Sequence, residues 1–319
     1  MARASVPNRV WAARKGLARA TADMALPRVR SLEPDGKVFL ITGGSSGIGE
    51  ACARRFVRAG ATVVLVARDA EKLRGTAEDI AAEFDAAERV SWWAGDVTDE
   101  TRIRQIVELA LERHGRIDVL INNAGRSIRR GAAHAVNRSH DYRRTMEANY
   151  LGAVVCTLAV LPGMIERRSG RIVNVSSIST QVYSPRYSAY VASKAALDAF
   201  GEVIAGEVAT RGITVSSVKV PLTRTPMIEP SRKVQPAPTI SPEQAAKLID
   251  RAVRYGQPTV STAAGRIGGR FALMFPRWAR LARQVEYLAL PESAAAVPRP
   301  EREMTDDDGP SEPAAGRSA

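Results

Sequence analysis

The stretch Thr42-Gly43-Gly44-Ser45-Ser46-Gly47-Ile48-Gly49 follows the apolar run Val38–Thr42 and leads into a helix-like segment. A glycine-rich turn between a first strand and a helix lets the backbone approach a pyrophosphate, which the free N–H groups and the positive dipole end of the helix can bind. Such a turn alone can be merely tight, but its place in a strand–turn–helix unit favours a dinucleotide site. We therefore expect a cofactor to contact Thr42, Gly43, Ser45, Ser46, Gly47, Ile48 and Gly49.

Short runs rich in valine and isoleucine alternate with helix-like segments from Lys37 onward. The runs are nearly unbroken, as expected for parallel strands that are covered on both faces. This rhythm predicts an α/β fold with a Rossmann-like, doubly wound parallel sheet in a single domain. The expected strands are Val38–Thr42, Thr62–Val66, Val90–Ala94, Val119–Asn122, Arg171–Ser176 and Thr214–Lys219. The expected helices are Gly49–Ala59, Ala70–Phe84, Glu100–His114 and Tyr190–Thr210.

Composition divides the chain into four segments. A basic leader covers residues 1–34, the Rossmann-fold domain covers 35–262, an amphipathic basic helical extension covers 263–290, and a tail covers 291–319. The tail is polar and contains a run of three aspartates, so we expect it to be disordered.

The helical extension follows an irregular, proline-rich stretch over Pro221–Pro242. A helix is expected to restart at Ser241-Pro242-Glu243, because serine caps a helix and proline suits its first turn. Further on, an apolar stripe recurs at alternating steps of four and three, with arginines beside it and Pro276 interrupting it. The stripe consists of Ile267, Phe271, Met274, Trp278, Leu281, Val285 and Leu288.

The formal charge of +12 on 319 residues lies largely in two flanking segments. Residues 1–30 hold seven Lys and Arg against Asp23 alone, and residues 251–283 hold seven Arg and no acid. No zinc-finger spacing or aromatic RNA-binding signature accompanies them, so we expect no nucleic-acid partner. An anionic surface, a membrane face or a polyanionic substrate fits this distribution better.

No segment has the pattern of a secretory signal or a comfortable membrane span. Basic residues interrupt the leader, and the longest uncharged run, Tyr150–Ile165, contains Pro162 and predicts a buried helix. We expect a cytoplasmic protein, with peripheral membrane contact left open. The two cysteines, Cys52 and Cys156, lie in apolar stretches and predict small buried side chains rather than disulfides. The three histidines lack metal-ligand spacing, so no metal site is expected.

The end of the second strand bears on the choice of cofactor. Ala67 is followed by Arg68 and Asp69. An acid at this point would bind the ribose 2′-hydroxyl of NAD(H), whereas arginine suits the 2′-phosphate of NADP(H). Arg68 therefore favours NADP(H) over NAD(H), although Asp69 leaves open that Arg68 is a solvated loop charge. Further cofactor contacts are expected at the ends of the third and fourth strands, from Asp96, Val97, Asn123, Ala124 and Gly125.

The candidate proton donor is Tyr190, in Tyr190-Val191-Ala192-Ser193-Lys194. This spacing puts a phenol and an ammonium group on one face of a helix. Free tyrosine titrates near pH ~10, and a nearby lysine with an oxidised nicotinamide would lower that pKa. By itself the pair is usually an ordinary helix surface. Ser177, at the end of a strand-like run, favours a catalytic role for the pair instead, because its hydroxyl could hold a substrate carbonyl.

Across roughly residues 36–230 the chain resembles the short-chain dehydrogenase/reductase family. The resemblance lies in the TGGSSGIG turn, Asp96, NNAG at 122–125, Asn149, Ser177 and YVASK at 190–194. It implies that Tyr190 is the general acid in reduction and that Lys194 binds the nicotinamide ribose and lowers the tyrosine pKa. It further implies that Ser177 orients the carbonyl and that Asn149 holds a water in the proton relay. A homo-oligomer built on the helices around Tyr150–Ile165 and Tyr190–Thr210 is also implied.

One departure from the family pattern follows the sixth strand. The family often has Pro-Gly there and then a threonine on the nicotinamide amide, whereas this chain has Pro221-Leu222-Thr223-Arg224-Thr225. Thr225 is the best match to that threonine. The run PLTRTPMIEP followed by APTISPEQAA also resembles the reductase domain of bacterial fatty acyl-CoA reductases, which form aldehydes from acyl thioesters with NADPH. Three hypotheses stay open: an NADPH-dependent reductase of a lipid-like carbonyl, a reductase or dehydrogenase of another ketone or alcohol such as a steroid or polyketide, and a non-catalytic nucleotide-binding scaffold.

Overall fold

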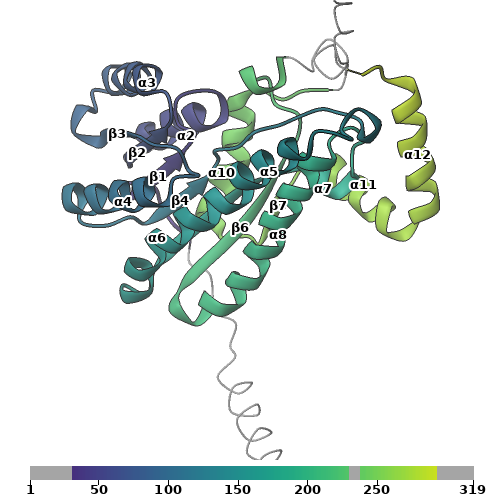
Figure 1. Ribbon diagram of the computed structural model, residues 1–319. Coiled ribbons are helices and arrows are strands. Elements are labelled where there is room, and N and C mark those ends of the chain that lie inside the picture. The colour runs from purple at the N-terminus through teal and green to yellow at the C-terminus, as the bar shows by residue number, and fades with distance from the viewer. Residues whose placement is uncertain (1–30, 230–237, 293–319) are drawn as a thin grey trace, which may run out of the picture.

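The computed structural model describes residues 31–229 and 238–292. A parallel sheet of seven strands forms its centre, with the strands in the order β3-β2-β1-β4-β5-β6-β7 (Figure 1). Strand order reverses between β1 and β4, where the carboxyl ends of the strands open a crevice for ligands. The sheet confirms the predicted doubly wound fold. The strands are β1 (Val38–Thr42), β2 (Thr62–Ala67), β3 (Val90–Ala94), β4 (Val119–Asn122), β5 (Gly170–Ser177), β6 (Ile213–Val220) and β7 (Thr259–Ser261).

Helices cover both faces of the sheet, because successive strand residues point to opposite faces. Phe39 and Ile41 of β1 pack in one apolar core with α2, α3 and α10. Leu40 packs in a second core with α4, α6 and α8. The helices are α2 (Gly47–Arg58), α3 (Ala70–Glu83), α4 (Glu100–His114), α5 (Ser139–Met146), α6 (Gly152–Glu166), α7 (Ser179–Val182), α8 (Ser188–Val208), α10 (Pro242–Tyr255), α11 (Ala263–Met274) and α12 (Pro276–Ala289).

The helical run Ser139–Glu166 joins α5 to α6 through a π-helical turn at Glu147–Leu151. Within the described residues it is the one helix long and apolar enough, by length and composition, to cross a membrane. Cys156, Val160 and Met164 of α6 are buried in the second core, so the run serves as a core helix. Cys156 and Cys52 are both buried and unpaired, as predicted.

The two flanking segments are described only at their inner ends. The predicted leader up to residue 30 and the predicted tail from residue 293 lie outside the described residues. The Leu32 amide donates to the Arg254 carbonyl at 2.9 Å, which ties the start of the domain to α10. Pro291 and Glu292, which the sequence assigned to the tail, contact the domain: the Arg129 guanidinium donates to the Pro291 carbonyl, and Glu292 pairs with Arg186. The last described residues therefore contact two arginines of the domain.

Candidate active site

Tyr190 and Lys194 lie on α8, one turn apart, and face the carboxyl end of β5. The Tyr190 hydroxyl is hydrogen bonded to Ser177, the last residue of β5. Lys194 is only 4% exposed, and its Nζ donates to the Val175 carbonyl at 2.7 Å. The strand end and the first turns of α8 thus bring three predicted site residues together. Their side chains offer a hydroxyl pair for a carbonyl oxygen, with a cation beside it.

Asn149 lies in the π-helical turn between α5 and α6 and is fully buried. Its Nδ2 donates to the Arg126 carbonyl at 2.9 Å and to Ser193 Oγ at 2.8 Å, and its Oδ1 accepts from the Arg126 amide at 2.6 Å. These three bonds fix the side-chain amide on both sides. A π-helical turn is frequent at functional sites because the extra residue re-aims side chains. Here it aims Asn149 at the loop after β4.

Gly125 forms the floor between Asn149 and Lys194. A Cβ at this position would lie 2.8 Å from Asn149 Oδ1 and 3.5 Å from Lys194 Nζ. The absence of a side chain therefore lets the β4 end, the π-helical turn and α8 converge. The four predicted catalytic side chains consequently lie around one point above the sheet.

Burial dominates the proton affinities of the Tyr190 and Lys194 side chains. It raises the pKa of Tyr190, with smaller upward contributions from Tyr187 and Asp198, while the hydrogen bond to Ser177 acts in the opposite direction. Burial lowers the pKa of Lys194 from 10.5 to about 8, against the opposing effect of Asp198. In the free protein the phenol is therefore protonated at neutral pH, which suits a proton donor. The expected lowering of the tyrosine pKa by Lys194 does not appear in the chain without cofactor.

Asp198 and Lys219 form a buried ion pair that the sequence analysis did not find. Asp198 follows Lys194 by one turn of α8, and Lys219 lies on β6, with side chains 16% and 11% exposed. Lys219 Nζ also donates to Thr180 Oγ1 of α7 at 3.2 Å. The pair thus joins α8, β6 and α7 beneath Ser177. Each residue looks ordinary in the sequence, and only the packing of α8 against β6 brings them together.

The glycine-rich turn is held to the end of β4 by a network of backbone contacts. Thr42 Oγ1 accepts from the amides of Asn123 and Ala124, both at 3.0 Å. Asn123 Nδ2 in turn donates to the carbonyls of Thr42 at 2.9 Å and Gly43 at 3.2 Å. Gly43 has a φ of 68°, where a side chain would also approach Asn123 Nδ2 at 2.9 Å. These residues therefore build the turn, and their side chains are committed to it.

The turn leaves a cradle that fits a pyrophosphate. A Cβ on Gly49 would lie 2.1 Å from the Gly43 carbonyl, and one on Gly47, whose φ is 58°, would lie 2.8 Å from Thr225 Cγ2. The Ser46 side chain makes no capping hydrogen bond at the start of α2, so the first amides of that helix point outward without it. Thr225, chosen from an altered motif, lies against this turn.

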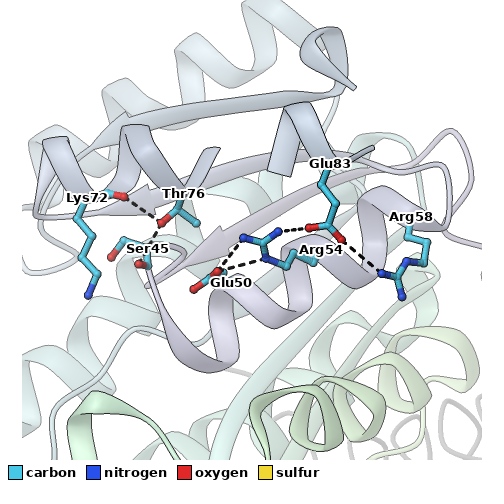
Figure 2. A network of polar contacts seen from close by, with 7 residues as sticks. All are labelled: Ser45, Glu50, Arg54, Arg58, Lys72, Thr76 and Glu83. Carbon is cyan, nitrogen blue, oxygen red and sulfur yellow. Dashed lines mark hydrogen bonds and ion pairs between the residues drawn. The ribbon is translucent and has the colours of Figure 1, made fainter. Parts of the chain in front are cut away.

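Helix α3 braces the turn and α2 from the side (Figure 2). Thr76 Oγ1 donates to the Ser45 carbonyl at 3.2 Å, and Arg54 lies between Glu50 of its own helix and Glu83 of α3. Arg58 adds a second contact to Glu83 at 3.5 Å. The ion pairs are partly exposed, so each contributes little to stability, but together they fix the spacing of the two helices.

Arg68 lies at the outer end of the crevice, exposed, with Nη1 3.8 Å from Asp96 Oδ2. Asp96 caps the following turn by accepting from the Thr98 amide at 3.0 Å, and Val97 is buried against Gly152. Arg126, which the sequence analysis did not single out, shares this electropositive region. Burial lowers its pKa, as do Arg144 and Arg68. Within the described ranges no three His, Cys, Asp or Glu side chains gather as a metal site would require.

Comparisons with known proteins agree with this geometry. Residues 37–236 match the family described as short chain dehydrogenase. The chain is 42% identical over 268 residues to a fatty acyl-CoA reductase of Acinetobacter baylyi, covering 84% of this chain and 90% of that protein. It is 36% identical to a fatty acyl-CoA reductase of Mycobacterium tuberculosis, covering 79% and 85%. A crystal structure of a short-chain dehydrogenase from Streptomyces avermitilis superposes with a TM-score of 0.66 at 32% identity, covering 79% of this chain and 98% of that one.

Proposed function

The chain belongs to the short-chain dehydrogenase family, an oxidoreductase family with nicotinamide cofactors, and from this premise we propose that it reduces fatty acyl-CoA thioesters to aldehydes with NADPH. The observation that carries the proposal is the hydrogen bond between Tyr190 and Ser177 beside the buried ammonium group of Lys194. The choice of substrate is supported by the identity to a fatty acyl-CoA reductase over 90% of that protein's length.

The crevice residues would hold the cofactor, which supplies a hydride when bound. The amides from Ser46 to Gly49 would bind the pyrophosphate, and Arg68 would pair with the 2′-phosphate. Asp96 would reach the adenine, Lys194 the nicotinamide ribose and Thr225 the nicotinamide amide. The exposed guanidinium of Arg68 and its nearest carboxylate at 3.8 Å leave that cation free to take a phosphate instead.

Ser177 and Tyr190 would both donate to the thioester carbonyl oxygen, which fixes the acyl group and polarises the bond. With hydride supplied by the bound cofactor, Tyr190 would give its proton to the carbonyl oxygen, and the substrate would become a hemithioacetal. The tyrosinate then takes that proton back while the carbon–sulfur bond breaks, and the departing thiolate takes a proton from water. The products are the aldehyde, free CoA thiol and oxidised cofactor. Lys194, mostly protonated at neutral pH, would act by binding the nicotinamide ribose.

The test is to incubate the full chain with NADPH and palmitoyl-CoA. We expect NADPH absorbance to fall and free CoA thiol to appear in equal amounts. Turnover of a ketone panel of steroids and polyketides without thiol release would instead support an alcohol or ketone oxidoreductase. Tight NADPH binding with no turnover of any carbonyl would support a nucleotide-binding scaffold and refute the proposal.

We also propose that the protein is a cytoplasmic homo-oligomer that pairs through the outer faces of α6 and α8. Leu158 on α6 and Val203 on α8 are exposed. Light scattering of the purified chain tests this, with Leu158→Glu/Val203→Glu expected to lower the mass to that of a monomer. An unchanged mass would exclude this interface.

A further inference from the structure

The α11–α12 hairpin exposes a dense set of large apolar side chains. Scattered exposed apolar residues are normal, but a contiguous set marks a binding surface. Ten such residues lie between Ile267 and Leu288. The two helices border an open groove of about 660 Å³. It is lined by Phe271, Phe275, Trp278, Leu281, Ala282 and Val285.

Packing among the described residues, 31–229 and 238–292, does not explain these apolar residues, because α11 meets the domain through glycines. A Cβ on Gly265 would lie 2.8 Å from Gln181 Oε1, and one on Gly269 would lie 3.2 Å from Gln181 Cβ. A Cβ on Gly268 would lie 3.0 Å from Val182 Cγ1. The large side chains of the hairpin therefore point away from the contact with α7.

Polar contacts to a catalytic loop hold α12 in place. Arg186, in the loop between Ser177 and Tyr190, donates to the Tyr287 carbonyl at 2.9 Å and stacks its guanidinium 4.1 Å from the Tyr287 ring centroid. Arg186 also pairs with Glu292 at 2.8 Å. The hairpin consequently stands at a fixed angle beside α7, at the end of the molecule away from β3 (Figure 1).

The charges around the apolar groove favour one kind of partner. Arg270, Arg277 and Arg280 are exposed, and no Asp or Glu occurs between residues 251 and 285. A two-fold contact with a second copy would bring this arginine-rich patch against the same arginine-rich patch of the partner. Exposed aromatic and aliphatic side chains flanked by arginine suit an anionic bilayer, where the apolar face enters the headgroup boundary.

We propose that the α11–α12 hairpin is a docking element for an anionic lipid surface. Its aromatic residues enter the headgroup boundary while Arg270, Arg277 and Arg280 contact lipid phosphates. Docking places the loop that carries Arg186, and hence the entrance between Ser177 and Tyr190, next to the bilayer. Access of membrane-dissolved acyl substrates is the consequence that rests on the proposed reductase function; docking itself does not depend on it.

Vesicle co-sedimentation of the full chain tests the proposal without reference to catalysis. We expect binding to phosphatidylcholine vesicles that contain phosphatidylglycerol and weak binding to phosphatidylcholine alone. Leu281→Gln/Val285→Gln should lower the affinity about tenfold. The matched control Leu109→Gln/Val136→Gln removes exposed apolar side chains elsewhere and should have no effect. Thermal melting checks that each variant is folded.

Two further measurements separate the lipid surface from other occupants. Arg277→Gln/Arg280→Gln should weaken vesicle binding about fivefold for each arginine, whereas Arg113→Gln/Arg211→Gln should not. Brominated phosphatidylcholine in the anionic vesicles should quench Trp278 fluorescence of the unmutated chain, identified by subtracting the Trp278→Phe signal. No binding to anionic vesicles would refute the proposal. So would a dimer that Leu281→Gln/Val285→Gln converts to a monomer while vesicle binding stays unchanged.

Discussion

Replacing Lys194 by methionine should abolish reduction and yet stabilise the fold at neutral pH. The lysine is nearly fully buried and forms no ion pair with the described carboxylates; burial lowers its pKa from 10.5 to about 8 against the opposing effect of Asp198. At about 1.4 kcal/mol for each tenfold change in proton affinity, the buried charge costs roughly 3 kcal/mol below pH 8. Methionine fills a similar volume without that cost. It also removes the hydrogen bond to the Val175 carbonyl, and this loss lowers the stability by about 1 kcal/mol.

The net gain of about 2 kcal/mol corresponds to a rise in Tm of roughly 4–8 °C for a domain of this size. The pH dependence of this stability gain tests whether the buried charge of Lys194 causes it. Between pH 8 and 10.5 the unfolded chain keeps the proton on Lys194 longer than the folded chain does, so the unmutated protein gains stability there as the pH rises. The advantage of Lys194→Met should therefore shrink through that window and vanish above it.

Thermal melts of the cofactor-free protein at pH 7, 9 and 10.5 provide the assay. The exposed lysine of α10 supplies the control, since Lys247→Met removes the same charge without burial. The reasoning fails if Lys194→Met melts below the unmutated protein at pH 7, or if the difference between them does not change with pH.

Three further outcomes follow from the site. Tyr190→Phe should lower kcat by about 10²–10⁴-fold with the Kd for NADPH unchanged, and equal turnover would exclude Tyr190 as the proton donor. Arg68→Gln should raise the Kd for NADPH by roughly tenfold or more and leave that for NADH unchanged; tighter binding of NADH by the unmutated chain would contradict the assignment. Gly49→Ala should abolish cofactor binding because its Cβ would lie 2.1 Å from the Gly43 carbonyl. Gly75→Ala, on α3 with open space around it, is the matched control and should retain binding.

The sheet could be predicted because its strands are buried on both faces and therefore uniformly apolar. Each of the six expected strands starts and ends within one residue of the structure. β7 was not predicted, because it has only three residues and Val260 is its one large apolar side chain. A pattern of that length cannot be distinguished from a loop, and pairing with β6 is what makes it a strand.

The candidate site was predictable where one motif lies on one element, as for the glycine-rich turn and the pair on α8. Arg126 and the Asp198–Lys219 pair were not predictable, because their roles depend on partners from separate elements. Asn149 shows both cases. Its position could be found from its motif, but the π-helical turn that orients it, which packs against α8, was not predicted from the sequence.

The loop between Ser177 and Tyr190 depends on segments outside the nucleotide-binding fold. The Arg130 amide donates to the Arg186 carbonyl at 2.7 Å, and the Arg186 side chain binds Tyr287 and Glu292. The two residues that would contact the carbonyl are thus separated by a loop whose conformation is set from β4 on one side and from α12 on the other. Helix α12 is also half of the proposed lipid-docking hairpin. A change in the orientation of this helix is therefore expected to shift the loop that carries Arg186 at the substrate entrance. Arg186 therefore links the loop between Ser177 and Tyr190 to the proposed lipid-docking hairpin. The sheet and α8 hold Ser177 and Tyr190 themselves.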